Sequence, residues 1–217
     1  MSKDLTARLA IGASILVLAA LALLHILSPE FDPAWRMVSE YANGNYSWVL
    51  SVMFFSWAIS SWMLAYILWS DVKTAGGKIG LYFLVATGVG EAMGGLFNIN
   101  HPLHGLSALI GIPSLAIAAV LISKSLSKET AWAAVKQPLL WSAHLTWISI
   151  LLMALTFVIM IVTFTQSGAE MPAEGTVITT LPDGVIGLVG WANRFLILVY
   201  CVWVSYTAWQ TLKRKQA

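Results

Sequence analysis

Residues 9–27 read LAIGASILVLAALALLHIL, a run without Asp, Glu, Lys or Arg. A helix rises about 1.5 Å per residue, so about 20 apolar residues cross the hydrocarbon core of a bilayer. Five further apolar segments of similar length follow along the chain. The sequence therefore predicts an all-α integral membrane bundle of six transmembrane helices in one domain, with approximate spans 8–27, 47–69, 79–97, 103–122, 139–165 and 185–209.

The composition excludes several classes of protein. The 217 residues are 59% hydrophobic and 10% charged, whereas soluble domains are about 25% charged. The mean hydropathy is +0.79. The net charge of +2 arises from short charged stretches between apolar segments, so we expect no nucleic-acid partner. A single cysteine, Cys201, excludes an intramolecular disulfide and a thiolate metal cluster.

Basic residues alternate with the predicted spans and so fall on one side of the membrane. They are Lys3, Arg8, Lys73, Lys78, Lys124, Lys128, Lys136, Lys213, Arg214 and Lys215. The positive-inside bias predicts that this side, with both termini, is cytoplasmic, and that the chain lies in the plasma (cell inner) membrane. No small-residue cleavage site follows the first run, so we expect it to be retained as a helix rather than removed as a signal peptide.

The first outer link, residues 28–46, reads SPEFDPAWRMVSEYANGNY and mixes aromatic, acidic and basic residues. We expect it to fold as a lid over the outer mouth of the bundle. The third span is rich in glycine, with Gly88, Gly90, Gly94 and Gly95, which permits the close approach of a neighbouring helix.

Two charged residues lie well inside the predicted spans, away from their ends, where each costs roughly 2.5 to 3.5 kcal/mol and calls for a partner or a function. Glu91 lies seven residues before Asn98, about 10 Å below the outer end of its helix. Arg194 lies nine residues into the last predicted span, at about 13 Å. We expect the two side chains to face the interior and to interact directly or through water. Such a pair either belongs to a functional site or only fixes the helix register.

The polar residues near the outer face predict a ligand-binding pocket. Its candidate residues are Arg36, Ser39, Glu40, Tyr41, Glu91, Asn98, His104, Asn193 and Arg194. Arg36 and Arg194 offer bidentate donors to a phosphate or carboxylate, and the surrounding helices offer an apolar wall. The leading hypothesis is therefore a multi-pass membrane protein that binds or handles a lipid or a small amphiphile. The pattern suits a transporter, a sensor or a transferase equally.

Other functions stay open on the same residues. His25, His101 and His104, with Glu40 or Glu91, offer zinc ligands for a membrane hydrolase or transferase, although no HExxH motif occurs in the chain. A single haem between His25 and His101 or His104 is a second alternative. Ser39 as a nucleophile has no G-x-S-x-G context. A homo-oligomer or a structural subunit of a membrane complex also stays open.

Three stretches of the chain resemble a known family. They are SEY at 39–41, NGNYSW at 43–48 and GGLFNINHPLHGLSALIG at 94–111. They are similar to the bacterial and archaeal membrane proteins grouped as domain of unknown function 998, which typically carry a G-x-F-P-x-D turn followed by a histidine. His104 matches that histidine, whereas Asn98 and Asn100 stand where the family has proline and aspartate.

The six-helix layout is also similar, more distantly, to the DRAM, Frag and Sfk group of eukaryotic membrane proteins. Some of those proteins are linked to lipid organisation and autophagy. The resemblance implies a multi-pass membrane fold and carries no established activity.

Overall fold

The computed structural model describes residues 2–169 and 180–214. These residues contain six helices that are long and apolar enough to cross a membrane, and no strand, as the sequence predicts. Two short 3-10 helices, η1 (Val38–Asn43) and η2 (Thr130–Val135), lie in the links. The long helices are α1 (Lys3–Leu27), α2 (Ser47–Leu68), α3 (Ala75–Leu96), α4 (His104–Leu126), α5 (Lys136–Gln166) and α6 (Val189–Arg214).

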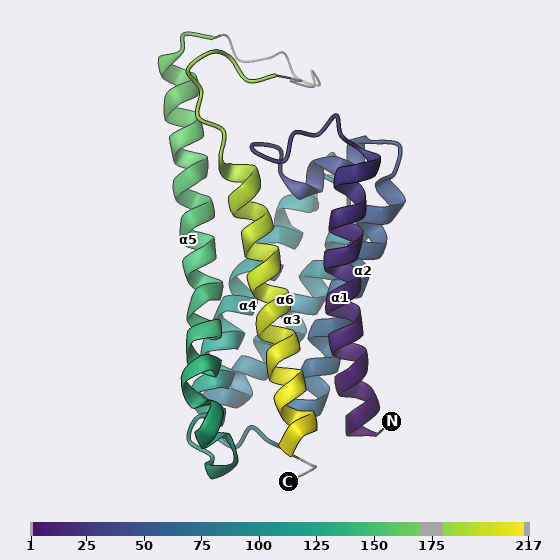
Figure 1. Cartoon of the computed structure of the whole chain (residues 1–217), viewed down its shortest axis with the longest axis vertical. Coiled ribbons are helices and arrows are strands. Elements are labelled where there is room, and N and C mark those ends of the chain that lie inside the picture. The colour runs from purple at the N-terminus through teal and green to yellow at the C-terminus, as the bar shows by residue number, and fades with distance from the viewer. Residues whose placement is uncertain (1, 170–179, 215–217) are drawn as a thin grey trace.

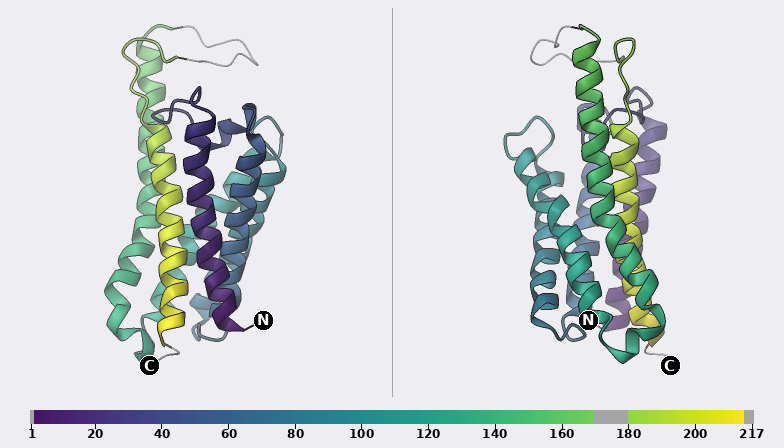
Figure 2. Two further views of the ribbon diagram at one scale, coloured as in Figure 1. Left: turned by 45° about the vertical axis from the view of Figure 1, so that its right-hand side comes forward. Right: turned by 90° about the vertical axis from the view of Figure 1, so that its left-hand side faces the viewer.

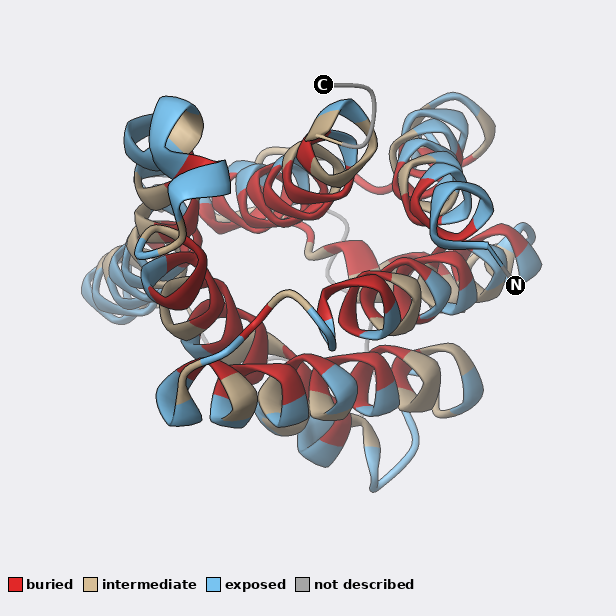
Figure 3. Ribbon diagram, turned by 90° about the horizontal axis from the view of Figure 1, so that it is seen from below, coloured by how far each residue is buried: buried red, intermediate tan, exposed pale blue. Residues whose placement is uncertain are grey.

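The six helices form a closed ring in chain order (Figure 1). Each helix packs against the next one in the chain, and α1 packs against α6 to close the ring. Both termini lie at one end of the bundle, here called the termini end, and residues 28–46 lie at the opposite end, here called the lid end. Seen from the termini end, buried residues line the inside of the ring and exposed residues cover its outside (Figure 3). Large apolar side chains such as Leu109 and Leu151 are exposed, as expected of a surface that faces lipid.

The glycine-rich third helix allows α3 and α4 to approach closely, as predicted. A Cβ atom at Gly90 would lie 2.4 Å from the backbone nitrogen of Gly111. A Cβ atom at Gly94 would lie 3.0 Å from the Phe54 ring on α2. Packing of this kind holds membrane helices together, because lipid tails are as apolar as the side chains and give no hydrophobic drive for helix association.

At the termini end, one carboxylate ties three parts of the chain together. Asp71, in the link between α2 and α3, lies 3.0 Å from the ammonium group of Lys3 and 3.7 Å from the guanidinium of Arg214. The Arg214 guanidinium lies 3.3 Å from the centre of the Trp132 ring. These contacts join α1, α6, η2 and the α2–α3 link where the helices leave the hydrocarbon.

The helix α5 is the longest, with 31 residues, and it rises beyond the other helices at the lid end (Figure 2). At about 1.5 Å per residue the length of α5 exceeds the roughly 30 Å thickness of the hydrocarbon core. The helix must therefore tilt or extend beyond the core. Its Thr163 hydroxyl accepts a hydrogen bond of 3.0 Å from the backbone nitrogen of Ile186. This bond ties the segment just before α6 to α5.

Gly90→Ala should lower the melting temperature of the purified protein by several degrees, because the added Cβ clashes with the α4 backbone. Overpacking of this kind costs about 1–3 kcal/mol, and each kcal/mol shifts the melting temperature by about 2–4 °C in a chain of this size. The measurement is thermal unfolding in detergent, followed by tryptophan fluorescence. Gly12→Ala is the matched control, since a Cβ there meets nothing within 4 Å. Equal melting temperatures for the two variants would contradict the proposed packing.

Candidate functional site

A cavity of about 290 Å³ lies inside the ring, beneath the lid. Its wall is mostly carbon, with a few polar groups from the lid, α3, α4 and α6. Helices α1 and α5 contribute none of its lining residues. The lining consists of Met37, Val38, Ser39, Phe54, Trp57, Gly90, Glu91, Gly94, Ile99, His104, Ser107, Ala108, Gly111, Ile112, Asn193, Leu196, Ile197 and Tyr200.

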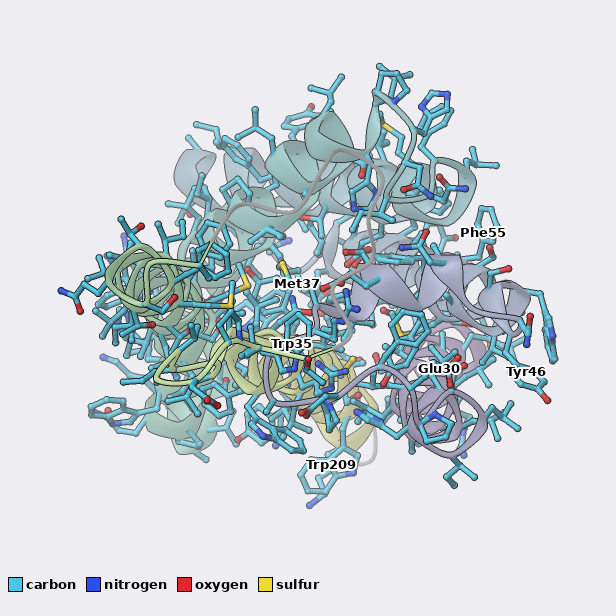
Figure 4. All side chains as sticks on the ribbon, turned by 90° about the horizontal axis from the view of Figure 1, so that it is seen from above. Glu30, Trp35, Met37, Tyr46, Phe55 and Trp209 are labelled. Carbon is cyan, nitrogen blue, oxygen red and sulfur yellow. The ribbon has the colours of Figure 1, made fainter. Side chains whose placement is uncertain are left out.

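The lid, residues 28–46, lies over the cavity and supplies part of its lining. Seen from the lid end, Trp35 and Met37 lie over the middle of the ring and Tyr46 lies at its edge (Figure 4). The η1 helix carries two of the lining residues, Val38 and Ser39, at the mouth of the cavity. The lid is therefore part of the cavity wall.

The first turn of α6 is built to receive the lid backbone. Gly190 donates a hydrogen bond of 2.9 Å from its backbone nitrogen to the carbonyl of Ala34. A Cβ atom at Gly190 would lie 2.5 Å from the carbonyl oxygen of Pro33, so only glycine allows this approach. The Oδ1 atom of Asn193 accepts a hydrogen bond of 2.9 Å from the backbone of Val38. These contacts satisfy both the exposed N–H groups of the helix start and the polar backbone of the lid.

Arg194 donates four hydrogen bonds from a side chain that is only 6% exposed, and two of them hold the lid. It donates to the carbonyl oxygen of Arg36 at 2.7 Å and to the hydroxyl of Tyr41 at 3.1 Å. It also donates to Nε2 of His25 on α1 at 2.7 Å and to the carbonyl of Gly190 at 3.0 Å. One guanidinium thus joins α1, α6 and the lid.

A second arginine stabilises the lid from within. The Arg36 guanidinium lies 2.5 Å from the carboxylate of Glu40 and 4.3 Å from the centre of the Trp35 ring. Glu40 also accepts a hydrogen bond of 2.7 Å from the backbone nitrogen of Met37. On the far side of the ring, Asn100 donates a hydrogen bond of 2.8 Å from its side chain to that of Asn43. The lid is therefore anchored at both ends.

Neither arginine is among the residues that line the cavity. Four candidate residues of the predicted pocket, Ser39, Glu91, His104 and Asn193, do line the cavity. Arg36, Glu40, Tyr41 and Arg194 instead bond within the lid or hold it in place. Asn98 also lies apart from the lining and accepts a hydrogen bond of 3.1 Å from the backbone of Asn100. The donors expected to bind an anionic head group are used by the protein itself.

The structure shows no direct ion pair between Glu91 and Arg194, and a contact between them through water stays a prediction. Among the described residues, Glu91 forms no ion pair, and its Oε2 atom accepts a hydrogen bond of 2.8 Å from Ser61. The helix α6 begins at Val189 rather than near residue 185. Arg194 therefore lies only about 8 Å into the helix. Four α6 residues line the cavity together with Glu91, namely Asn193, Leu196, Ile197 and Tyr200, and Tyr200 lies about 9 Å further along the helix than Arg194.

The three histidines expected to converge on a metal ion are engaged separately. His25 accepts the bond from Arg194, His101 stacks on the Phe97 ring at 4.5 Å, and Nδ1 of His104 lies 2.9 Å from the carbonyl oxygen of Phe97. No group of three His, Cys, Asp or Glu side chains in the described residues is placed to hold a metal ion. The ligand set of the zinc hypothesis is therefore not assembled. The haem alternative stays a prediction.

Aromatic residues deep in the cavity were missed by the sequence analysis. Trp57 lies between Phe54 and Tyr200, with ring centres 6.2 Å and 6.0 Å away. The Tyr200 hydroxyl donates a hydrogen bond of 2.7 Å to the carbonyl of Ile112 on α4. In an apolar span these side chains look like ordinary core residues. Ser61 lies one helical turn after Trp57, so the two side chains share a face of α2. This polar residue in an apolar span could have indicated that the face meets a polar group, which in the structure is the carboxyl of Glu91.

The fold and the cavity define a multi-pass helical membrane protein with an internal, lid-covered cavity. The chain belongs to the family described as protein of unknown function (DUF998), whose model matches residues 11–210. This confirms the family resemblance. No curated protein and no solved structure matches the chain.

Arg194→Ala should loosen the lid, because it removes the bonds to the carbonyl of Arg36 and the hydroxyl of Tyr41. Hydrogen bonds from charged groups contribute about 1.5–3 kcal/mol each, so we expect amide exchange in residues 36–43 to be at least about tenfold faster. Hydrogen–deuterium exchange of the purified protein measures this rate.

Arg194→Lys should give an intermediate rate of amide exchange, because lysine keeps the positive charge but lacks the several N–H donors of the guanidinium. Arg8→Ala, at an exposed position on α1, is the control and should leave the lid unchanged. Equal exchange of the lid in the Arg194→Ala and Arg8→Ala proteins would refute the role of Arg194.

Proposed function

We propose that this protein binds a lipid or a small amphiphile in the cavity beneath the lid. The observation that carries the proposal is the cavity itself, about 290 Å³ with a mostly apolar wall and few polar groups. Small-molecule sites in proteins have this character, with an apolar lining that gives affinity and a few polar groups that orient the ligand. The surrounding bilayer supplies amphiphiles at high local concentration.

The arrangement of the polar groups supports a binding function over a catalytic one. Ser39 and His104 both line the cavity, yet no hydrogen bond joins them among the described residues. A serine nucleophile needs a base within hydrogen-bond reach. The protein would thus serve as a carrier, a sensor or a transporter of its ligand.

The distribution of charge supports an orientation in the plasma membrane. Lys3, Lys73, Lys124 and Arg214 lie at the termini end, and the lid end carries acidic residues such as Glu30. By the positive-inside bias, both termini face the cytoplasm and the lid lies at the outer leaflet. The ligand would then reach the cavity from the outer half of the bilayer or from the external solution.

Cavity-filling variants test the binding proposal. A photoreactive medium-chain alkyl diazirine should label peptides of α3, α4 and α6 that line the cavity, in addition to the lipid-facing surface of α5. Ala108→Trp should reduce the cavity labelling to the background of α5, since the indole occupies the space. Ala154→Trp, at an exposed position of α5, should leave cavity labelling intact. Cavity labelling that is absent from the unmodified protein, or unchanged by Ala108→Trp, contradicts the proposal.

Accessible thiols test the orientation. With Cys201 replaced by Ser, an Asp32→Cys protein should react in intact cells with a membrane-impermeant maleimide, because Asp32 is exposed on the lid. A Lys73→Cys protein should react only after the cells are opened. The reverse pattern of labelling would show that the termini lie outside.

A further inference from the structure

We propose that the cavity selects amphiphiles whose head group is a protonated amine, which pairs with the carboxyl of Glu91. This inference rests on the proposed binding function and specifies the chemistry of the ligand. It replaces the anionic head group that the sequence favours. Four observations carry it: an unpartnered carboxyl oxygen, the absence of a lining cation, an aromatic wall beside it, and the engagement of both nearby arginines.

The first observation is the state of the Glu91 side chain. Glu91 is 6% exposed and lines the cavity. Ser61 donates a hydrogen bond to Oε2, while Oε1 is fully buried and has no hydrogen-bond partner among the described residues. Buried polar atoms in proteins are almost always hydrogen-bonded, and each exception calls for an explanation such as a bound ligand, ion or water. A donor on a ligand in the cavity would complete the bonding of this carboxyl.

The second observation concerns charge. The residues that line the cavity include no lysine and no arginine. Within the described ranges, 2–169 and 180–214, no cationic side chain lies within ion-pair distance of Glu91. In an apolar membrane interior a carboxyl group stays ionised only beside a counter-charge, and otherwise takes up a proton. A ligand ammonium supplies that charge together with the missing hydrogen-bond donor.

The third observation is the aromatic wall. Trp57, Phe54 and Tyr200 line the cavity along with Glu91, and the rings of Trp57 and Tyr200 meet edge to face. Aromatic faces attract cations, most strongly where water is excluded. The indole nitrogen of Trp57 is itself buried without a hydrogen-bond partner among the described residues. A hydroxyl beside the amine would accept a hydrogen bond from it.

The arginines give the fourth observation and oppose an anionic head group. The donors of Arg194 are directed to His25, to its own helix and to the lid. Arg36 pairs with Glu40. An anion in the cavity would meet the carboxyl of Glu91 with neither arginine among the lining residues to offset the repulsion.

Three photoreactive probes with the same medium alkyl chain test this inference. They carry a primary amine, a hydroxyl or a carboxylate as head group, and are compared at equal membrane concentration. The readout is labelling of cavity peptides relative to labelling of α5 in the same sample. In the unmodified protein we expect the amine to exceed the alcohol by about tenfold or more, and the carboxylate to label least.

Glu91→Gln is the decisive variant, because the amide keeps the shape and can still accept from Ser61 while it removes the charge. The preference for the amine should disappear in Glu91→Gln. The control variant Glu30→Gln removes an exposed carboxylate at the lid end and should retain the preference for the amine. A preference for the amine that survives in Glu91→Gln would overturn the role of Glu91.

The outcomes also separate this inference from the proposed binding function. Equal cavity labelling by all three probes, still blocked by Ala108→Trp, would overturn the amine selectivity and leave the binding function in place. Cavity labelling by none of the probes would overturn both. If Glu91→Gln fails to fold, the comparison of the three probes on the unmodified protein decides the selectivity by itself.

Discussion

The structure depends on one buried guanidinium. Arg194 lies within a helix that crosses the membrane, where an unsatisfied cation is costly, so its donors must find acceptors inside the protein. They find them on α1, on α6 itself and on the lid. The same contacts close the ring between the first and last helices and hold the lid over the cavity. The position of the lid thus follows from the need to bury this charge with its partners.

The second buried charge has the opposite surroundings. Glu91 lines the cavity, with Ser61 as its hydrogen-bond donor and a mostly apolar and aromatic wall around it. The chain thereby separates its two ionisable residues at membrane depth. The cation maintains the architecture, and the acid faces the space beneath the lid. A direct ion pair between them would have neutralised both and left the cavity without a charged group.

The glycines determine how closely these parts approach. Gly90 brings α4 against α3 next to Glu91, and Gly190 admits the lid backbone to the start of α6. A side chain at either position would separate segments that line the cavity. Close packing around small residues and a cavity lined by large aromatic residues therefore occur side by side, and the contrast in side-chain size creates the enclosed space.

The sequence by itself determined the six spans, because hydrophobicity is a local property and each apolar segment inserts into the bilayer according to its own composition. Short motifs in the chain also identified the family. The predicted helix boundaries agree with the structure to within five residues. Only the tertiary structure decided which polar groups meet. The partners of Arg194 and Glu91 come from segments far apart in the chain, and their choice depends on helix rotation and close packing, which no local pattern encodes.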